Sequence, residues 1–294
     1  MHNAIMYNEL LNLIFKTAPL GFIPATKQLV EYINSTDTLL DIIQQIGTIP
    51  ESIEHDSSEE KLFSKASDAL LSRAFRELGL KSTVITERAD AADVFAESPI
   101  YGYTLVADAK AFRMSRTAKN QKDFKVTALS GWRNDSDYSV LCSPFFQYPQ
   151  SKSQIYKQAI DNNVALISWE HITFFLEHDI KENDNINLAP IWNFSANYAE
   201  TVVVSKSKRC FIPDYSKFLV EYVGYSISDF AILIDTQIEL ITKRGNIERD
   251  YWENKKNEIL SYSCEKAIAE LIKSKKIDEK ISQIESYIRG LQNA

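Results

Sequence analysis

A strand-like stretch near the middle of the chain carries a carboxylate and an amine two residues apart. Asp108 and Lys110 stand in the sequence VADAK, where they alternate with Ala107 and Ala109. In a β-strand this alternation places the two charged side chains on one face and the alanines on the other. Burying such a pair is costly unless it is ion-paired, solvated in a cleft or bound to a metal. The pattern therefore indicates either a salt bridge at a sheet edge or a metal site.

An acid followed two residues later by lysine is not specific by itself. The same spacing recurs at Glu59, Asp123, Asp179, Glu253 and Asp278. Asp108 differs because a second acid, Asp93, precedes it by fifteen residues and opens the apolar stretch Val94-Phe95-Ala96. Two adjacent strands joined by a turn would bring Asp93 and Asp108 within reach of one cation.

Two carboxylates and an ammonium group suit chemistry at a phosphate. Carboxylate oxygens are preferred ligands of Mg²⁺, which can lower the pKa of a bound water and stabilise charge on a phosphate. Lys110 could position or deprotonate that water and offset phosphoryl charge. We therefore expect Asp93 and Asp108 to bind Mg²⁺, with Lys110 acting beside them.

Two other acids have open roles. Glu87 is near enough in sequence to supply a further carboxylate, or it pairs with Arg88 on the surface. Asp123 could accept a hydrogen bond from a cytosine amino group, assist metal binding, or pair with Lys119 or Lys122.

Positive charge is concentrated directly after this site. Residues 110–133 contain seven lysines and arginines against Asp123 alone, although the whole chain has a net charge of −7. Such segregation provides the positive footprint that nucleic-acid binding needs, although a solvated helix face is the alternative. Lysine and arginine contact phosphates, and Asn and Gln can bind adenine in the major groove. The candidate DNA-binding residues are Arg113, Arg116, Lys119, Asn120, Gln121, Lys122 and Lys125.

Other function classes lack their usual patterns. None of the eight glycines forms a dinucleotide-binding or phosphate-binding loop, and no Gly-x-Ser-x-Gly elbow is present. The three cysteines have no disulfide or zinc spacing. No apolar run approaches the roughly 18 residues of a membrane-spanning helix, and the apolar N-terminus lacks a signal peptide's basic start. We expect a cytoplasmic protein.

The elements that must position these residues form a mixed pattern. Ser57 and Glu60 fit a capping-box pattern, which predicts an amphipathic helix that begins there and runs to about Leu78, before Gly79. The fold expected is α/β, with a mixed β-sheet flanked by helices and with helical N- and C-terminal regions. The expected strands are 92–96, 103–109, 138–142 and 164–168, and the expected helices include a basic one at 117–132, another at 151–162 and almost everything after 215.

Asp93, Asp108 and Lys110 resemble the motif of the PD-(D/E)xK nuclease superfamily, with Ala92 in place of the usual proline. Longer strings are similar to the HindIII-like type II restriction endonucleases, and this resemblance becomes weaker after about residue 195. The strings are LVADAK at 105–110, SRTAKNQKDFKV at 115–126, SPFFQYP at 143–149, KSQI at 152–155, EKLFSKA at 60–66, SWEH at 168–171 and IWNF at 191–194.

The resemblance implies a restriction-endonuclease-like fold and a homodimer that cuts the palindrome AAGCTT after the first A, leaving 5′ overhangs. It also implies a partner DNA methyltransferase and catalytic roles for Asp93, Asp108, Lys110, Glu87 and Asp123. We expect one endonuclease unit over residues 1–294, divided into a helical entry (1–56), a catalytic core (57–194) and a mainly helical region (195–294). The rivals are a DNA-binding protein without catalysis and a structure-specific repair nuclease.

Overall fold

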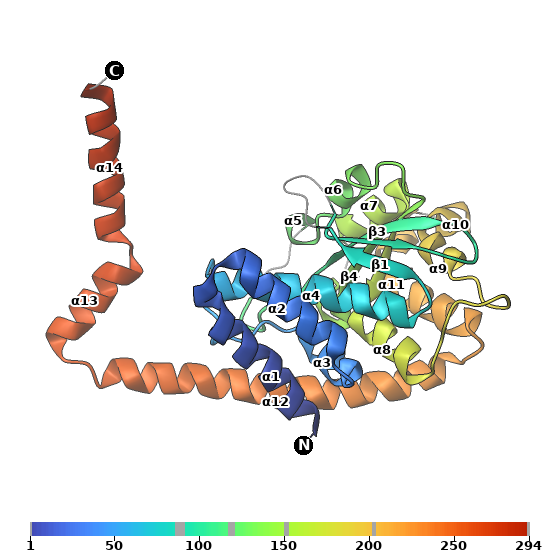
Figure 1. The fold of residues 1–294 in the computed structure, drawn as a ribbon, viewed down its shortest axis with the longest axis horizontal. Helices are drawn as coiled ribbons and strands as arrows, with labels where there is room; N and C mark the ends of the chain where they lie inside the picture. The colour runs from blue at the N-terminus through green and yellow to red at the C-terminus, as the bar shows by residue number, and fades with distance from the viewer. Residues whose placement is uncertain (1, 86–91, 117–120, 150–152, 202–203, 293–294) are drawn as a thin grey trace. The chain divides into compact units, whose positions relative to one another are not determined.

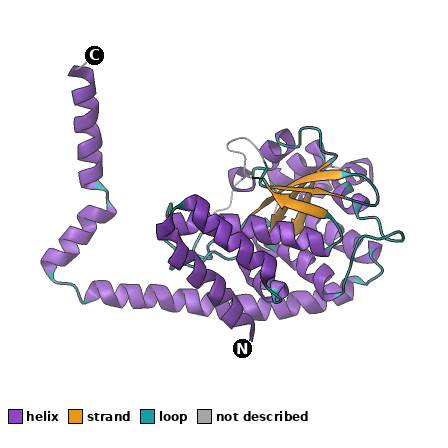
Figure 2. Ribbon diagram, in the orientation of Figure 1, coloured by secondary structure: helices purple, strands orange, loops and turns teal. Residues whose placement is uncertain are grey.

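The centre of the fold is a five-stranded mixed sheet (Figures 1 and 2). Asp108 lies in one of its strands, and Asp93 and Lys110 are directly adjacent to strand ends. The computed structural model describes residues 2–85, 92–116, 121–149, 153–201 and 204–292. The strands follow chain order across the sheet; β1 to β3 are antiparallel neighbours, whereas β3, β4 and β5 run parallel. Their bounds are β1 Lys81–Val84, β2 Val94–Glu97, β3 Thr104–Ala109, β4 Tyr138–Ser143 and β5 Val164–Ser168.

The parallel and antiparallel halves of this sheet differ in how deeply their residues are buried. In β5 every residue is buried, and in β3 and β4 all but the first are, as expected where helices cover parallel strands. The outer strand β1 alternates between exposed and buried residues. The expected α/β fold with a mixed sheet flanked by helices is confirmed, and four of the strands agree with the sequence prediction to within two residues.

Helix α4 (Ser58–Glu77) packs against β1, β2 and β3. The Ser57 hydroxyl accepts the Glu60 amide at 3.1 Å, which is one half of the expected capping box. The Glu60 carboxylate accepts the Asp56 amide at 2.7 Å instead of the Ser57 amide that a capping box requires. The helix ends at Glu77, Leu78 caps it, and the following Gly79 adopts a φ of +92°. A side chain at Gly79 would also meet the Glu182 carbonyl at 3.0 Å, so both conformation and space require glycine there.

The continuous basic helix expected at 117–132 is wrong for the described part of that range. Two short helices, α5 (Gln121–Phe124) and α6 (Val126–Gly131), stand there instead. Lys125 separates them with a φ of +50°, a left-handed conformation that interrupts helical hydrogen bonding. The turn lets Phe124 and Val126, on either side of it, both be buried.

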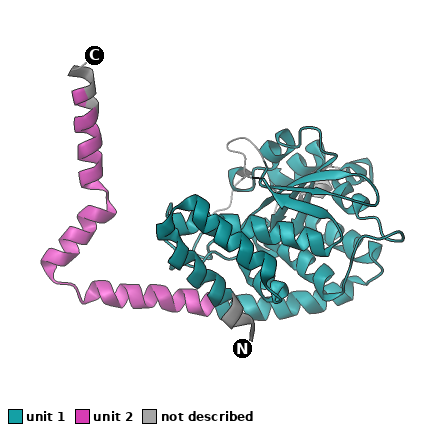
Figure 3. Ribbon diagram, viewed as in Figure 1, with its two compact units in different colours: residues 1–244 teal, residues 245–294 magenta. Residues whose placement is uncertain are grey.

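The remaining helices make up most of the C-terminal region. The chain divides into two compact units, residues 1–244 and 245–294 (Figure 3), and α12 contributes to both. None of the helices in the described ranges has the length and apolar character needed to cross a bilayer. Their bounds are α1 His2–Thr17, η1 Ala18–Leu20, α2 Phe22–Ser35, α3 Leu39–Ile46, η2 Phe145–Gln147, α7 Gln154–Asn162, α8 Trp169–Glu177, α9 Ala189–Trp192, α10 Phe194–Thr201, α11 Val204–Tyr222, α12 Ile227–Leu260, α13 Cys264–Ser274 and α14 Ile277–Gln292.

Candidate active site

Asp108 and Lys110 lie together at the end of β3, as their spacing predicts. Asp108 is only 2% exposed, and its carboxylate is ion-paired with the Lys110 ammonium. The main chain of Lys110 is fixed from two sides: its N–H donates to the Cys142 carbonyl at 2.7 Å, and its carbonyl accepts the Trp169 indole N–H at 2.9 Å. The position of the lysine therefore depends on β4 and α8 as well as on its own strand.

Asp93 reaches this site through the antiparallel pairing of β2 and β3. Val94 lies opposite Ala107, so one more step of the same register brings Asp93 level with Asp108. The Asp93 carbonyl accepts the Ile85 amide at 2.8 Å, which extends the pairing of β1 and β2 up to this residue. The predicted meeting of Asp93 and Asp108 is therefore present.

Asp68 is a third carboxylate at the site, and sequence reasoning missed it. It lies on α4 and is buried, and one carboxylate oxygen from each of Asp68, Asp93 and Asp108 lies within 4.8 Å of the others. A signal was available: Asp68 is the single charged residue in the stretch Ala66-Ser67-Asp68-Ala69-Leu70-Leu71. An acid inside the apolar part of an amphipathic helix needs a partner.

Two of the three carboxylates, those of Asp68 and Asp108, have raised pKa values. Burial raises the pKa of Asp68 well above its ordinary value, and repulsion from Asp93 adds to this rise, whereas Lys65 opposes it. Burial also raises the pKa of Asp108, and the Lys110 ammonium opposes that effect. A divalent cation would favour the charged forms of both acids. Three oxygen donors around one point are the chemistry that a hard cation prefers, so these residues fit a metal ion.

Lys65 is the second ammonium group of the site. It stands one turn before Asp68 on α4, and its Nζ lies 3.2 Å from the Asp68 carboxylate. The same Nζ is ion-paired with Asp93. Lys65 therefore bridges the carboxylate of the helix and that of the sheet, and sequence reasoning did not identify it.

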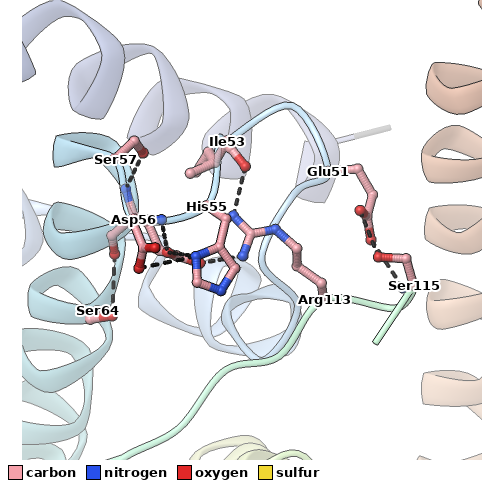
Figure 4. A network of polar contacts seen from close by, with 9 residues as sticks. Glu51, Ile53, His55, Asp56, Ser57, Ser64, Arg113 and Ser115 are labelled. Carbon is pink, nitrogen blue, oxygen red and sulfur yellow. Dashed lines mark hydrogen bonds and ion pairs between the residues drawn. The ribbon is translucent and has the colours of Figure 1, made fainter. Parts of the chain in front are cut away.

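A polar network fixes the segment that leaves the active site (Figure 4). Arg113 is ion-paired with Glu60, and its guanidinium donates to the Ile53 carbonyl at 2.6 Å. Glu51 accepts the Ser115 amide at 3.0 Å and the Ser115 hydroxyl at 2.8 Å. These contacts attach residues 113–115 to the first turn of α4 and to the loop before it, so the chain leaves Lys110 along a defined path.

The same network contains another acidic group, His55, Asp56 and Glu60. His55 Nδ1 lies 3.0 Å from the Asp56 carboxylate, but both side chains are largely exposed. The Glu60 carboxylate also accepts the Asp56 amide at 2.7 Å and pairs with Arg113. The Glu60 oxygens already accept hydrogen bonds from the Asp56 amide and from Arg113. The group of His55, Asp56 and Glu60 is therefore more exposed than the buried carboxylates at Asp108, and one of its members is already engaged.

Several candidate DNA-binding residues can be placed. Arg113 belongs to the polar network, whereas Lys122 and Lys125 are exposed. Arg116 is ion-paired with Asp123, a partner other than the two lysines that spacing suggested. Glu87, Lys119 and Asn120 lie outside the described residues, as does the side chain of Gln121.

Known proteins with similar sequences were compared with this chain. A family model described as HindIII restriction endonuclease matches residues 27–288. The type II restriction enzyme HindIII of Haemophilus influenzae is 41% identical over 287 residues, which cover 97% of this chain and 96% of that enzyme. The similarity therefore continues well beyond residue 195.

Proposed function

The chain belongs to the HindIII family of type II restriction endonucleases, and from that membership we propose that it cuts double-stranded DNA at AAGCTT, after the first A, leaving 5′ overhangs. The observation that carries the proposed cleavage is the cluster of Asp68, Asp93 and Asp108, whose oxygens lie within 4.8 Å of one another beside a lysine, whereas the proposed site AAGCTT comes from the family alone. A family relationship alone would not require the cutting site to be intact. The geometry supports an intact one.

We propose that the three carboxylates hold Mg²⁺. Bound there, the ion would supply a water of lowered pKa and stabilise charge on the phosphate. Asp108 is the central ligand in this proposal because β3 places it between Asp93 on one side and Lys110 on the other. Asp68 adds a donor from a different element, so the site depends on the packing of α4 against the sheet.

Lys110 is proposed to orient the attacking water and to offset charge on the phosphate. Its ammonium is already directed to the metal side of the strand by Asp108. Because its main chain is held by Cys142 and Trp169, the side chain starts from a fixed point, and its ion pair with Asp108 directs the ammonium to the carboxylates. Such preorganisation is a large part of catalysis at phosphate centres.

DNA recognition is proposed for the basic segment, with its seven candidates at positions 113, 116, 119–122 and 125. Lys122 and Lys125 are exposed and suit phosphate contacts. Asn120 and Gln121 stay candidates for adenine because their amides can form paired hydrogen bonds with its edge. Catalytic roles for Glu87 and Asp123 also stay predictions, and the ion pair with Arg116 gives Asp123 a structural alternative.

We propose that two copies act as a homodimer, because a palindromic site presents the same half-site twice and each protomer would cut one strand. A DNA methyltransferase that modifies the same site is the proposed functional partner. It would be needed because an active enzyme of this kind also cuts unmodified sites in the DNA of its own cell.

The test is cleavage of a plasmid with one AAGCTT site, in Mg²⁺ and in EDTA, followed by sequencing of the ends. We expect linear product only with Mg²⁺, with 5′ overhangs beginning after the first A. Cutting at another palindrome would overturn the specificity, and cutting without sequence preference would favour a structure-specific nuclease.

Asp108→Asn separates catalysis from binding. We expect at least about 10³-fold slower cleavage, since a metal ligand is lost, while the variant still shifts a labelled AAGCTT duplex in a binding assay. Specific binding by a wild-type protein that never cuts would instead favour the rival without catalysis.

A further inference from the structure

Lys65 occupies an unusual position for a lysine on a packed helix. Its Nζ contacts the carboxylates of both Asp68 and Asp93, and its side chain is only 24% exposed. Lys61, one turn earlier on the same helix, is exposed. The two lysines therefore differ in environment although they share one helix.

The charges around Lys65 explain its placement. Asp68, Asp93 and Asp108 bring three carboxylate oxygens within 4.8 Å of one another. Lys110 pairs with Asp108, at the sheet side of the group. The carboxylates of Asp68 and Asp93 would repel each other across the gap between α4 and β2 if no positive charge stood between them, and the Lys65 ammonium stands there.

We propose that Lys65 is a positioning residue of the metal site: its ammonium holds Asp68 and Asp93 together in the metal-free enzyme and is displaced when a divalent cation takes their oxygens. The inference rests on the proposed function, because it assumes that these carboxylates are metal ligands. Lysine suits the role since its flexible four-carbon stem lets the ammonium move without rearranging the helix.

A positioning role for Lys65 predicts whether this lysine raises or lowers the affinity for the metal. An incoming cation must compete with Lys65 for the same carboxylates, and it also meets the repulsion of the ammonium. Lys65 should therefore weaken metal binding in the absence of DNA, although it organises the ligands. A lysine that only supported the packing of the site would have the opposite effect, because its removal would scatter the ligands and weaken metal binding.

The experiment is calorimetric titration of Ca²⁺, an oxygen-preferring divalent cation, into the full-length protein without DNA. Lys65→Met should bind Ca²⁺ at least about tenfold more tightly than the wild type, because a competing positive charge is lost. Lys65→Arg, which keeps the charge, should stay close to the wild type. Lys61→Met, the same change one turn away, should leave the affinity unchanged.

Unchanged or weaker Ca²⁺ binding by Lys65→Met would overturn the inference. Asp108→Asn distinguishes this failure from that of the proposed function, since it should weaken Ca²⁺ binding if the metal site exists. If Asp108→Asn has no effect, the metal site itself fails, and both proposals fall together. Should Lys65→Met not fold, Lys65→Gln retains a polar side chain without the charge and supports the same comparison.

Discussion

Asp68 shows how a single buried charge depends on its neighbours. Most of the side chains around it on α4 are apolar and buried, and Lys65 is its ion-pair partner. A buried carboxylate of this kind contributes little to stability by itself, because the cost of desolvation offsets the attraction to its partner. A role as a metal ligand explains better why an acid stands at this position.

Asp68→Asn therefore tests the third ligand. The amide keeps the shape of the side chain but removes one negative charge from the metal site. We expect cleavage of the plasmid at limiting Mg²⁺ to slow by about 10²-fold, a typical cost of disturbing a metal site's ligation, and higher Mg²⁺ to restore part of the rate. Asp235→Asn, at an exposed position of α12, is the control. A variant of Asp68 with wild-type Mg²⁺ dependence would show that this acid is structural.

Sequence reasoning found the site residues that lie close together in the chain. Asp93, Asp108 and Lys110 follow from the period of two in neighbouring strands, because one hairpin-like pairing brings them together. Asp68 and Lys65 precede Asp93 by at least 25 residues and lie on a helix. Their contact with the strands depends on how α4 packs against the sheet, and no local sequence pattern predicts the orientation of a helix on a sheet.

At the scale of elements, the ends of helices and the apolar strands could be predicted from the sequence, whereas a break within a helical segment could not. The cap at Ser57 and the stop at Gly79 are local chemistry, so α4 was expected correctly. The break at Lys125 comes from tertiary packing, since lysine carries no local signal for a left-handed turn. The short edge strand β1, with its alternating polar residues, was not expected either.

Helix α8 contains a buried carboxylate that should make the stability of the fold depend on pH. Glu170, in its first turn, accepts the Phe145 amide at 2.8 Å and so ties α8 to η2. Burial raises the pKa of Glu170 from 4.5 to about 7, although hydrogen bonds from the main chain and from Ser168 oppose this. Because the folded state keeps the proton that the unfolded chain releases, this contribution to stability is complete below pH 4.5 and is lost as pH rises through about 7.

Glu170→Gln removes this dependence while retaining an acceptor for the Phe145 amide. Relative to the wild type, the variant should gain about 3 kcal/mol of unfolding free energy between pH 4.5 and pH 8, at about 1.4 kcal/mol per pKa unit. Urea unfolding of both proteins at the two pH values, in EDTA, measures the change. His171, whose buried ring has a pKa lowered to about 3, destabilises the fold at low pH in both proteins and so cancels from the comparison. An equal stability difference at both pH values would contradict the prediction.

At the scale of the whole molecule, the C-terminal unit differs from the rest in how much of its apolar surface is exposed. Residues 1–244 contain the described buried core, whereas the unit 245–294 is helical and has many exposed apolar side chains. Contiguous apolar surface on a protein in water usually marks a surface that another protein covers. The proposed homodimer provides such a partner, because a second copy of this chain is needed to match a palindromic site.

Helix α14 provides the sharpest test of that idea. Ile277, Ile281, Ile284 and Ile288 recur every three or four residues and are all exposed, which is the stripe that helices use to pack against one another. If this stripe lies in the dimer interface, Ile281→Glu should bury a charge there and raise the dimer dissociation constant by at least about tenfold, a cost of 1.4 kcal/mol or more. Sedimentation velocity across a concentration series measures it.

Gln283→Glu, at another exposed position of α14, adds the same charge and should leave the dimer unchanged. Dissociation should also alter the products of cleavage. Each protomer is proposed to cut one strand, so at concentrations where Ile281→Glu is monomeric we expect nicked circles to accumulate before linear DNA. A variant that stays dimeric would place the interface outside the stripe of α14. A monomeric variant that still linearises plasmid in one step would contradict the division of labour between two protomers.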